Sequence, residues 1–290
     1  MAEPVLVVLG RGVVPADTPV LRADDLGVLR GDGIFETMHV RDGADGRPHP
    51  WLLDEHLARM VRSAARMDLA LPEAAVLREL AELACAQWPA GTEGAVRLVC
   101  TRGTESQAAV GGPVTCFATV NPVGPASLAA RRDGVAVAAL TLGFPAAART
   151  PAPWLLGGVK SLSYAVNMAS LRWAAANGVD DVLWVSEDGF ALEAPTATLV
   201  WLEGDTLYTV PAAQTGILPG TTAAYLLAAA GELGLSAAER MVTPTELRGG
   251  DGVWLLSSIR GITEIRSIDG AVLPPSALTG KLRAHLGFLV

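Results

Sequence analysis

Residues 31–40 read Gly-Asp-Gly-Ile-Phe-Glu-Thr-Met-His-Val. The first three residues, Gly31 to Gly33, are typical of a tight turn, because glycine adopts backbone angles that other residues avoid. From Ile34 to Val40 apolar and polar side chains alternate, which predicts a strand with one buried face. The stretch therefore indicates a chain that enters a sheet directly from a tight turn.

Strand and helix patterns follow one another irregularly on both sides of this strand. Further strands are predicted at residues 5–9, 96–101, 114–120, 134–142, 181–185, 199–202, 206–210, 253–257 and 262–268, and helices at 54–67, 73–88, 164–176, 221–233 and 277–286. Residues 121–132 show no clear period, so we expect them to link a small N-terminal α/β domain (1–120) to a larger C-terminal one (133–290). No Gly-x-Gly-x-x-Gly follows the first strand, which argues against a dinucleotide-binding domain.

The bulk composition restricts the partners and the compartment. The 290-residue chain is half hydrophobic and carries a formal charge of −8, so neither nucleic acid nor an anionic membrane is an expected partner. No apolar run could span a bilayer and the start lacks signal-peptide features, so we expect a cytoplasmic protein. The three cysteines, Cys85, Cys100 and Cys116, show no metal or redox spacing and are expected to be reduced, buried thiols.

Lysine is rare in this chain. Only two of the 22 basic residues are lysines, Lys160 and Lys281, and arginine cannot replace lysine in imine formation because a guanidinium is not deprotonated. Lys160 follows Gly157-Gly158 and precedes a predicted helix, a position from which the amine can point into a cleft and act as a nucleophile and base. On position alone, an ordinary surface lysine is the favoured interpretation.

Four further features could bind a small ligand that carries both a phosphate and a cationic group. Glu193 has apolar neighbours, and a carboxylate in an apolar cleft needs a cationic partner. The turn at 217–222, Ile-Leu-Pro-Gly-Thr-Thr, precedes a helix and offers N–H groups and hydroxyls to a phosphate, although a plain threonine helix cap is a common alternative. Ser258 could add a hydroxyl. Arg59 is predicted to lie off the apolar stripe of helix 54–67, either solvated or as a phosphate clamp.

In their order along the chain, these motifs resemble the class IV aminotransferases, the fold type IV enzymes that use pyridoxal 5'-phosphate (PLP). The segment 31–37 resembles the family's N-terminal Gly-Asp-Gly-x-Phe-Glu signature, and His56-Leu-x-Arg59 resembles the helix whose arginine grips the cofactor phosphate. Lys160 with Tyr164 resembles the Schiff-base lysine and its nearby tyrosine. The resemblance implies a mixed α/β, two-domain, D-amino acid aminotransferase-like fold, a larger domain that carries the lysine, and a homodimer.

The resemblance also implies a set of site residues. Glu193 falls where the family pairs a carboxylate with the pyridine nitrogen, and Thr198 stands where the family usually carries asparagine. The implied catalytic residue is Lys160, and the implied cofactor contacts are Arg59, Lys160, Tyr164, Glu193, Leu218, Gly220, Thr221, Thr222 and Ser258. Arg30, Arg97 and Ile259 are candidates for binding the substrate, with Arg102 and Arg260 as further arginines that the sequence does not rank. No metal site is expected.

The segment 97–103, Arg-Leu-Val-Cys-Thr-Arg-Gly, looks closer to the aminodeoxychorismate lyases than to other members. The resemblance thus implies a lyase that releases pyruvate from a small-molecule amine, 4-amino-4-deoxychorismate, to give 4-aminobenzoate for folate biosynthesis. The alternative is a class IV aminotransferase acting on D-amino acids such as D-alanine, or on branched-chain amino acids. A catalytically silent binding protein of this fold would lack the lysine or the glutamate, and both are present.

Overall fold

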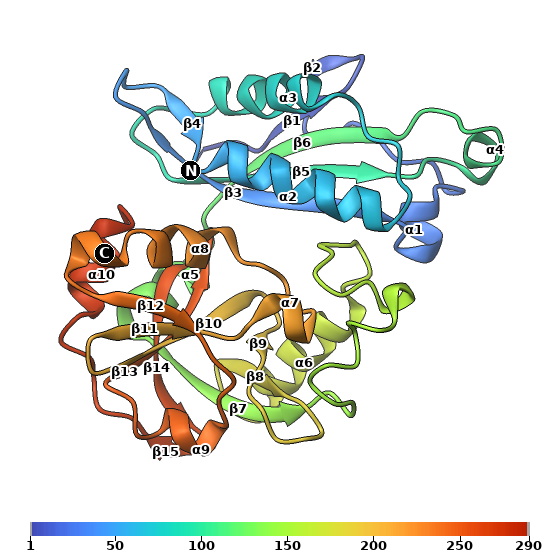
Figure 1. Cartoon of the computed structure of the whole chain (residues 1–290). Coiled ribbons are helices and arrows are strands. Elements are labelled where there is room, and N and C mark those ends of the chain that lie inside the picture. The colour runs from blue at the N-terminus through green and yellow to red at the C-terminus, as the bar shows by residue number, and fades with distance from the viewer. Residues whose placement is uncertain (1, 289–290) are drawn as a thin grey trace. The chain divides into compact units, whose positions relative to one another are not determined.

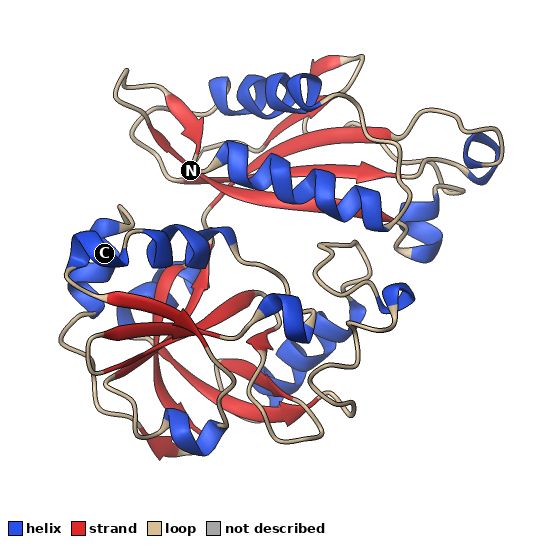
Figure 2. Cartoon of the chain, in the orientation of Figure 1, coloured by secondary structure: helices blue, strands red, loops and turns tan. Residues whose placement is uncertain are grey.

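A computed structural model describes residues 2–288 (Figure 1). The chain forms two compact units. The first contains the residues up to Gly124 together with Val159–Tyr164, and the second contains Pro125–Gly158 and the residues from Ala165 onward. Both units combine a sheet with helices (Figure 2), which confirms the mixed α/β fold that the sequence predicted. Within residues 2–288, none of the helices combines the length and the apolar character that a membrane span requires.

The first unit is built on a six-stranded antiparallel sheet in the order β2-β1-β6-β5-β3-β4. Its strands are β1 (Val5–Val8), β2 (Gly12–Val14), β3 (Gly33–Asp42), β4 (Pro48–Pro50), β5 (Gly94–Thr101) and β6 (Thr115–Pro122), and its helices are α1 (Leu26–Arg30), α2 (Leu53–Arg66), α3 (Ala74–Ala86) and α4 (Glu105–Ala108). Helices α2 and α3 pack on the sheet (Figure 1). Alternate residues of the strands, such as Met38 and Leu98, form one core with Met60 of α2 and Leu77 of α3.

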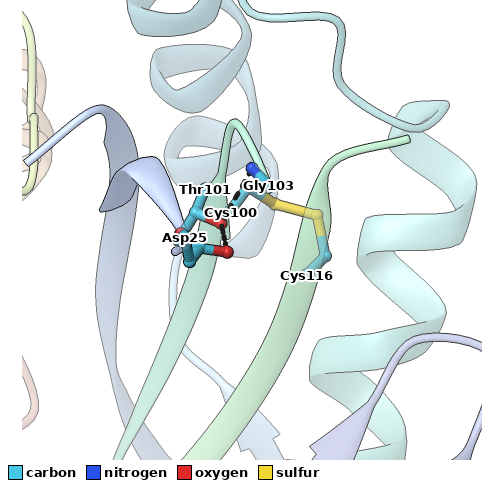
Figure 3. Close-up of a disulfide and its surroundings, with 5 residues drawn as sticks. All are labelled: Asp25, Cys100, Thr101, Gly103 and Cys116. Carbon is cyan, nitrogen blue, oxygen red and sulfur yellow. Dashed lines mark hydrogen bonds between the residues drawn. A yellow bond between two sulfur atoms is a disulfide. The ribbon is translucent and has the colours of Figure 1, made fainter. Parts of the chain in front are cut away.

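The cysteines of this unit differ from the expectation of reduced thiols. Strands β5 and β6 pair so that Cys100 stands directly opposite Cys116, with Cα atoms 4.3 Å apart, and the two form a disulfide (Figure 3). Cys85 is a free, buried thiol, as expected. The disulfide was missed because it follows from strand register, which the spacing of three cysteines in the sequence does not reveal.

The second unit contains a nine-stranded mixed sheet whose main path is β12-β11-β10-β13-β14-β7-β8, with β9 on β10 and β15 on β14. Its strands are β7 (Val135–Thr141), β8 (Asp181–Val185), β9 (Glu193–Ala194), β10 (Ala197–Glu203), β11 (Thr206–Thr209), β12 (Ser236–Glu239), β13 (Gly252–Ser257), β14 (Gly261–Ile268) and β15 (Ala271–Val272). Its helices are α5 (Pro125–Asp133), η1 (Pro153–Leu155), α6 (Ala165–Ala176), α7 (Ala212–Thr215), α8 (Thr221–Ala228), η2 (Ala230–Leu233), α9 (Pro244–Leu247) and α10 (Thr279–His285). Its core contains apolar residues of β7, β10 and β13, among them Val137, Leu199, Trp201 and Leu255.

Two predictions about elements in this unit were wrong. The segment 121–132, expected to be an irregular linker, holds helix α5. This helix was not predicted because Arg131 is its only buried residue, so the segment shows no apolar period. The helix predicted at 221–233 is divided into α8 and the short η2.

Candidate functional site

The segment that carries Lys160 packs within the first unit, although it follows the second unit's first strand in sequence. Strand β4 pairs only with the far end of β3, at Val40–Asp42. At the other end, the edge of β3 takes up the lysine segment instead: Phe35 donates its N–H to the Lys160 carbonyl, and Leu162 donates to the carbonyl of Gly33. A sheet edge leaves N–H and C=O groups that need partners, and this segment supplies them. The lysine therefore differs from the expectation that the larger C-terminal domain carries it.

The Lys160 amine is partly buried and surrounded by ring atoms. Its Nζ lies 3.2 Å from the Tyr164 hydroxyl and 4.4 Å from the centroid of the Phe35 ring. The Phe35 and Tyr164 rings meet edge to face at 5.1 Å. The predicted pairing of Lys160 with Tyr164 is thus present in the structure. Phe35, which comes from the glycine-rich signature, was not predicted as a contact of the amine.

Arg97 lies over the same phenyl ring. The register of β3 and β5 places Thr37 against Arg97, and the Arg97 guanidinium lies 5.4 Å from the Phe35 centroid and bonds to the Thr37 hydroxyl at 3.3 Å. Two cationic groups, the amine and this guanidinium, therefore share one aromatic ring. Arg97 is exposed and remains available to a ligand.

The other arginine candidates have structural partners or lie in solvent. Arg102 bonds to Asp32 at 2.6 Å and also to two backbone carbonyls. Arg260 bonds to Asp181, a buried carboxylate, at 2.6 Å. Arg30 ends α1 and is exposed. Of the four arginines, Arg97 is the one whose guanidinium lies over the ring that the Lys160 amine contacts.

Arg59 is buried, contrary to the prediction that it lies off the core face of its helix. Only 4% of the residue is exposed, whereas the apolar Val61 on the same helix is 47% exposed. The guanidinium forms a two-pronged ion pair with Glu36 on β3, with Nε–Oε1 at 2.8 Å and Nη2–Oε2 at 2.7 Å. Arg59 is buried because it pairs with a carboxylate on the inner face of the neighbouring strand, and this pairing is not visible in the sequence of the helix.

His56 completes this buried cluster. Its Nδ1 lies 2.6 Å from Glu36 Oε2, and both side chains are inaccessible to solvent. Burial lowers the pKa of His56, so the ring is neutral and donates Nδ1–H to the carboxylate. For Glu36, burial by itself raises the pKa, but the charge and hydrogen bonds of Arg59 together with the bond from His56 outweigh it and hold the pKa at about 2.

In the second unit, Glu193 lies on the two-residue strand β9 and is 8% exposed. Its Oε2 accepts the Leu218 N–H at 3.2 Å, and its Oε1 lies 3.7 Å from an Arg149 nitrogen. The structure thus brings together two predicted cofactor contacts, Glu193 and Leu218. Arg149 is a neighbour that the sequence analysis did not name.

The turn before α8 forms a narrow cradle. Gly220 is the N-cap of α8 and provides no side-chain cap, so the first-turn N–H groups point out of the helix end. A Cβ added at Gly220 would collide with the Thr198 hydroxyl, so only glycine fits there. Within residues 2–288 the buried Thr222 hydroxyl finds no hydrogen-bond partner. Thr198, the departure from the family pattern, therefore lies directly behind the cradle.

The Ser258–Arg260 turn, between β13 and β14, is held in place from both sides. Arg131 donates to the Ile259 carbonyl at 2.7 Å, and the Arg260 side chain is held by Asp181. Ser258 and Ile259 are partly buried. Two arginines thus fix the backbone of the turn, while the Ile259 N–H and the Ser258 hydroxyl are the groups that the resemblance assigns to an anion.

The side chains present fit PLP. The first unit has an amine in contact with aromatic rings and a buried guanidinium. The second unit has a buried carboxylate, suited to a protonated pyridine nitrogen, and an unsatisfied hydroxyl at the N-terminus of a helix, suited to a phosphate. Among the described residues, no group of three or more His, Cys, Asp or Glu side chains is arranged to hold a metal ion.

Comparison with known proteins agrees with this donor set. The family model described as amino-transferase class IV matches residues 33–268. A bifunctional aminodeoxychorismate lyase / D-amino acid transaminase of Mycobacterium tuberculosis is 39% identical over 277 residues, which is 93% of each chain. The PLP-bound structure of a hypothetical aminotransferase from Mycobacterium tuberculosis has a TM-score of 0.91 at 37% identity, covering 98% of this chain and 97% of that one. A fold IV-transaminase from Curtobacterium pusillum has a TM-score of 0.87 at 36% identity over the same shares. The chain therefore belongs to the class IV aminotransferases and is a PLP-dependent enzyme.

Proposed function

We propose that Lys160 is the residue that binds the PLP aldehyde and that the enzyme is an aminodeoxychorismate lyase. The observation that carries the first part is the position of the Lys160 amine, against Phe35 and within hydrogen-bond distance of the Tyr164 hydroxyl. The second part is supported by the 39% identical relative, whose name includes aminodeoxychorismate lyase. A lysine so placed is an amine nucleophile and, once released, a base. PLP, when bound, supplies an electrophilic aldehyde and an electron-withdrawing ring.

Each remaining site residue has one role in the proposal. Glu193 keeps a proton on the ring nitrogen, since its carboxylate is the charge that a pyridinium needs. Arg59 binds the phosphate, and Tyr164 fixes the Lys160 amine. Leu218 orients Glu193 through its N–H. The α8 cradle adds Gly220, Thr221 and Thr222, and Ser258 adds a hydroxyl, so that N–H and O–H donors surround the phosphate oxygens.

Lys160 moves the proton in the proposed reaction. Its free amine takes the proton from C4 of 4-amino-4-deoxychorismate, the carbon that bears nitrogen, and the bond from C3 to the enolpyruvyl oxygen breaks. The ring becomes aromatic, and the released enolpyruvate takes up a proton to become pyruvate. Arg97, whose guanidinium lies over the same Phe35 ring as the amine, is the proposed partner of a substrate carboxylate, with the Ile259 N–H as a second donor. Arg30 is the weaker candidate for this role.

A D-amino acid transaminase is the second candidate, because the 39% identical relative carries both activities in its name. The two reactions share the proton removal by Lys160 and differ in the next step. The lyase breaks the bond from C3 to the enolpyruvyl oxygen, whereas a transaminase returns the proton to a different carbon and releases a keto acid. Pyruvate release from aminodeoxychorismate should therefore be compared with keto-acid formation from D-alanine and 2-oxoglutarate in one preparation. A rate with D-alanine that exceeds the lyase rate by kcat/KM would reject the lyase as the main activity.

Attachment of PLP is tested separately from the choice of reaction. Borohydride reduction of the PLP-loaded protein should leave a pyridoxyl group on the peptide that contains Lys160, as read by mass spectrometry. Lys160→Ala should abolish both the label and the violet absorbance band, whereas Lys281→Ala should keep both, because the Lys281 amine bonds to the Leu233 carbonyl. A label on Lys281 alone, or none, would reject the proposed site.

We also propose that the enzyme is a homodimer. Helix α6 supports this, because only Ala174 of its residues is buried while Val166, Met168 and Trp173 are exposed by 63%, 43% and 43%. An apolar surface of this kind is typical of a contact between proteins. The mass in solution by light scattering tests it, and a monomer at micromolar concentration would contradict it. The cytoplasmic location and the role in folate biosynthesis stay predictions.

A further inference from the structure

Glu36 is a buried charge that the proposed chemistry does not use. It lies on the inner face of β3, is fully inaccessible to solvent, and contacts two side chains of α2, Arg59 and His56. Taking a carboxylate out of water is costly unless hydrogen bonds and an opposite charge compensate it. Its position, beside the arginine proposed to bind phosphate, therefore calls for an explanation.

Considered by charge alone, Glu36 should weaken the binding of a phosphate by Arg59. An anion less than 3 Å from Arg59 cancels most of that residue's positive field, which weakens its pull on a phosphate. The orientation that Glu36 imposes on the Arg59 guanidinium should instead strengthen phosphate binding. The two prongs to Glu36 engage Nε and Nη2, which fixes the plane of the guanidinium and directs its Nη1–Nη2 edge away from the carboxylate. A planar fork held in this way loses little freedom when an oxyanion binds its remaining edge.

The same cluster is linked to the backbone of Lys160. His56 donates to Glu36 from one turn before Arg59, so the carboxylate is held between two points of α2. One turn further along α2, the Ser63 hydroxyl accepts the Lys160 N–H at 3.3 Å. The arginine and the lysine segment are therefore positioned by a single helix, and Glu36 fastens that helix to β3.

We propose that Glu36 is a positioning residue that holds the Arg59 guanidinium in the orientation that binds the phosphate monoester of the cofactor. The inference rests on the proposed roles of Arg59 and Lys160. It makes a prediction opposite to that of a pure charge effect. Loss of the Glu36 charge should weaken phosphate binding even though the local positive charge increases.

The test compares two ligands that differ only in the phosphate, PLP and pyridoxal. Their dissociation constants are measured by equilibrium dialysis on the apo protein carrying Glu36→Gln, which keeps the shape but presents an amide N–H₂ where Arg59 and His56 need an acceptor. PLP affinity should fall about 10-fold or more, the size expected for lost hydrogen bonds to a charged group. Pyridoxal affinity should stay within about twofold, since it has no phosphate.

Two further variants separate position from charge and from folding. Glu55→Gln removes one exposed charge from the same helix and should leave both affinities unchanged. Glu36→Asp keeps the charge but withdraws the carboxylate by one methylene, so positioning predicts a selective loss of PLP affinity in this variant too, and it serves as the test if Glu36→Gln does not fold. Tighter PLP binding, an unchanged ratio of the two affinities, or an equal loss for both ligands would each overturn the inference.

Failure of the proposed function gives a different result. If borohydride leaves no pyridoxyl group on Lys160 of the wild-type protein, the cofactor site itself is wrong and the inference fails with it. If Lys160 is labelled and the affinity ratio of Glu36→Gln equals that of the wild type, only the role of Glu36 is rejected.

Discussion

Among residues 2–288, each unit holds one buried glutamate, and the two have different partners. Glu36 in the first unit has two bonds from Arg59 below 3 Å and one from His56. Glu193 in the second unit accepts a Leu218 N–H at 3.2 Å, and an Arg149 nitrogen lies 3.7 Å from its Oε1. Strong internal partners indicate a carboxylate that serves the fold and orients its neighbours. The Leu218 and Arg149 contacts at Glu193 are longer, and in the proposed site a pyridinium nitrogen adds a further charged partner.

The largest expected effect tests the structural half of this comparison. Glu36→Ala leaves the Arg59 charge buried without its carboxylate, and removal of one partner from such a pair costs about 3–5 kcal/mol of unfolding free energy. Urea denaturation of the apo protein measures it. Glu193→Ala is the matched variant in the other unit and should cost less than half as much. Equal losses would remove the distinction between the two glutamates.

The pH dependence of stability should show the same difference. The pKa of Glu36 is about 2 in the folded protein and 4.5 in an ordinary glutamate, so its contribution is complete above pH 4.5 and is lost as the pH falls toward 2. That difference corresponds to about 3 kcal/mol. Burial also lowers the pKa of His56 below 6.5. Below that pH the imidazole takes up a proton more readily in the unfolded chain than in the folded protein, so stability begins to fall there.

Denaturation midpoints between pH 7 and 2 check this prediction. Glu36→Gln should flatten the curve below pH 4.5, while Glu55→Gln, which changes an exposed carboxylate on the same helix, should follow the wild type. A Glu36→Gln curve that remains parallel to the wild type would show that this carboxylate is not the group that acid titrates.

The functional half of the comparison concerns activity. Glu193→Gln should reduce kcat by about 100-fold, a typical loss for one preorganised electrostatic partner of a reacting group, because the amide cannot hold a proton on the ring nitrogen. The unfolding free energy of the apo protein should change by less than about 1 kcal/mol. Steady-state kinetics with saturating PLP measures the first quantity. A loss of stability with unchanged kcat would show Glu193 to be structural.

Sequence alone predicted most of the elements. The alternation of residues 34–40 predicted β3, and the helical period of residues 54–67 predicted α2, because these features depend on local pattern, which a sequence displays directly. The site residues came from the family resemblance and stay predictions. The structure places Lys160 near Tyr164, as the resemblance implies, and brings Glu193 and Leu218 together.

The features that could not be predicted from the sequence depend on which helices and strands pack against one another. The Glu36–His56–Arg59 cluster forms only because α2 packs on β3. The Cys100–Cys116 disulfide needs the register of β5 and β6. The membership of Lys160 in the first unit depends on the open edge of β3. Glu36 nevertheless has a signal in the sequence, because a glutamate at an inward position of an alternating strand needs a buried cationic partner.

The smallest expected effect concerns Thr222, whose buried hydroxyl has no partner within residues 2–288. An unsatisfied hydroxyl costs stability, so Thr222→Val should leave the apo protein as stable as the wild type or about 1 kcal/mol more stable. If that hydroxyl binds the phosphate, the same change should weaken PLP binding by roughly 5- to 10-fold. Thr263, on β14, is also buried with an unsatisfied hydroxyl and is the matched control. Thr263→Val should reproduce the effect on stability and leave PLP affinity unchanged, so that a difference between the two variants in dialysis, with similar melting behaviour, isolates the contribution of the helix cradle to cofactor binding.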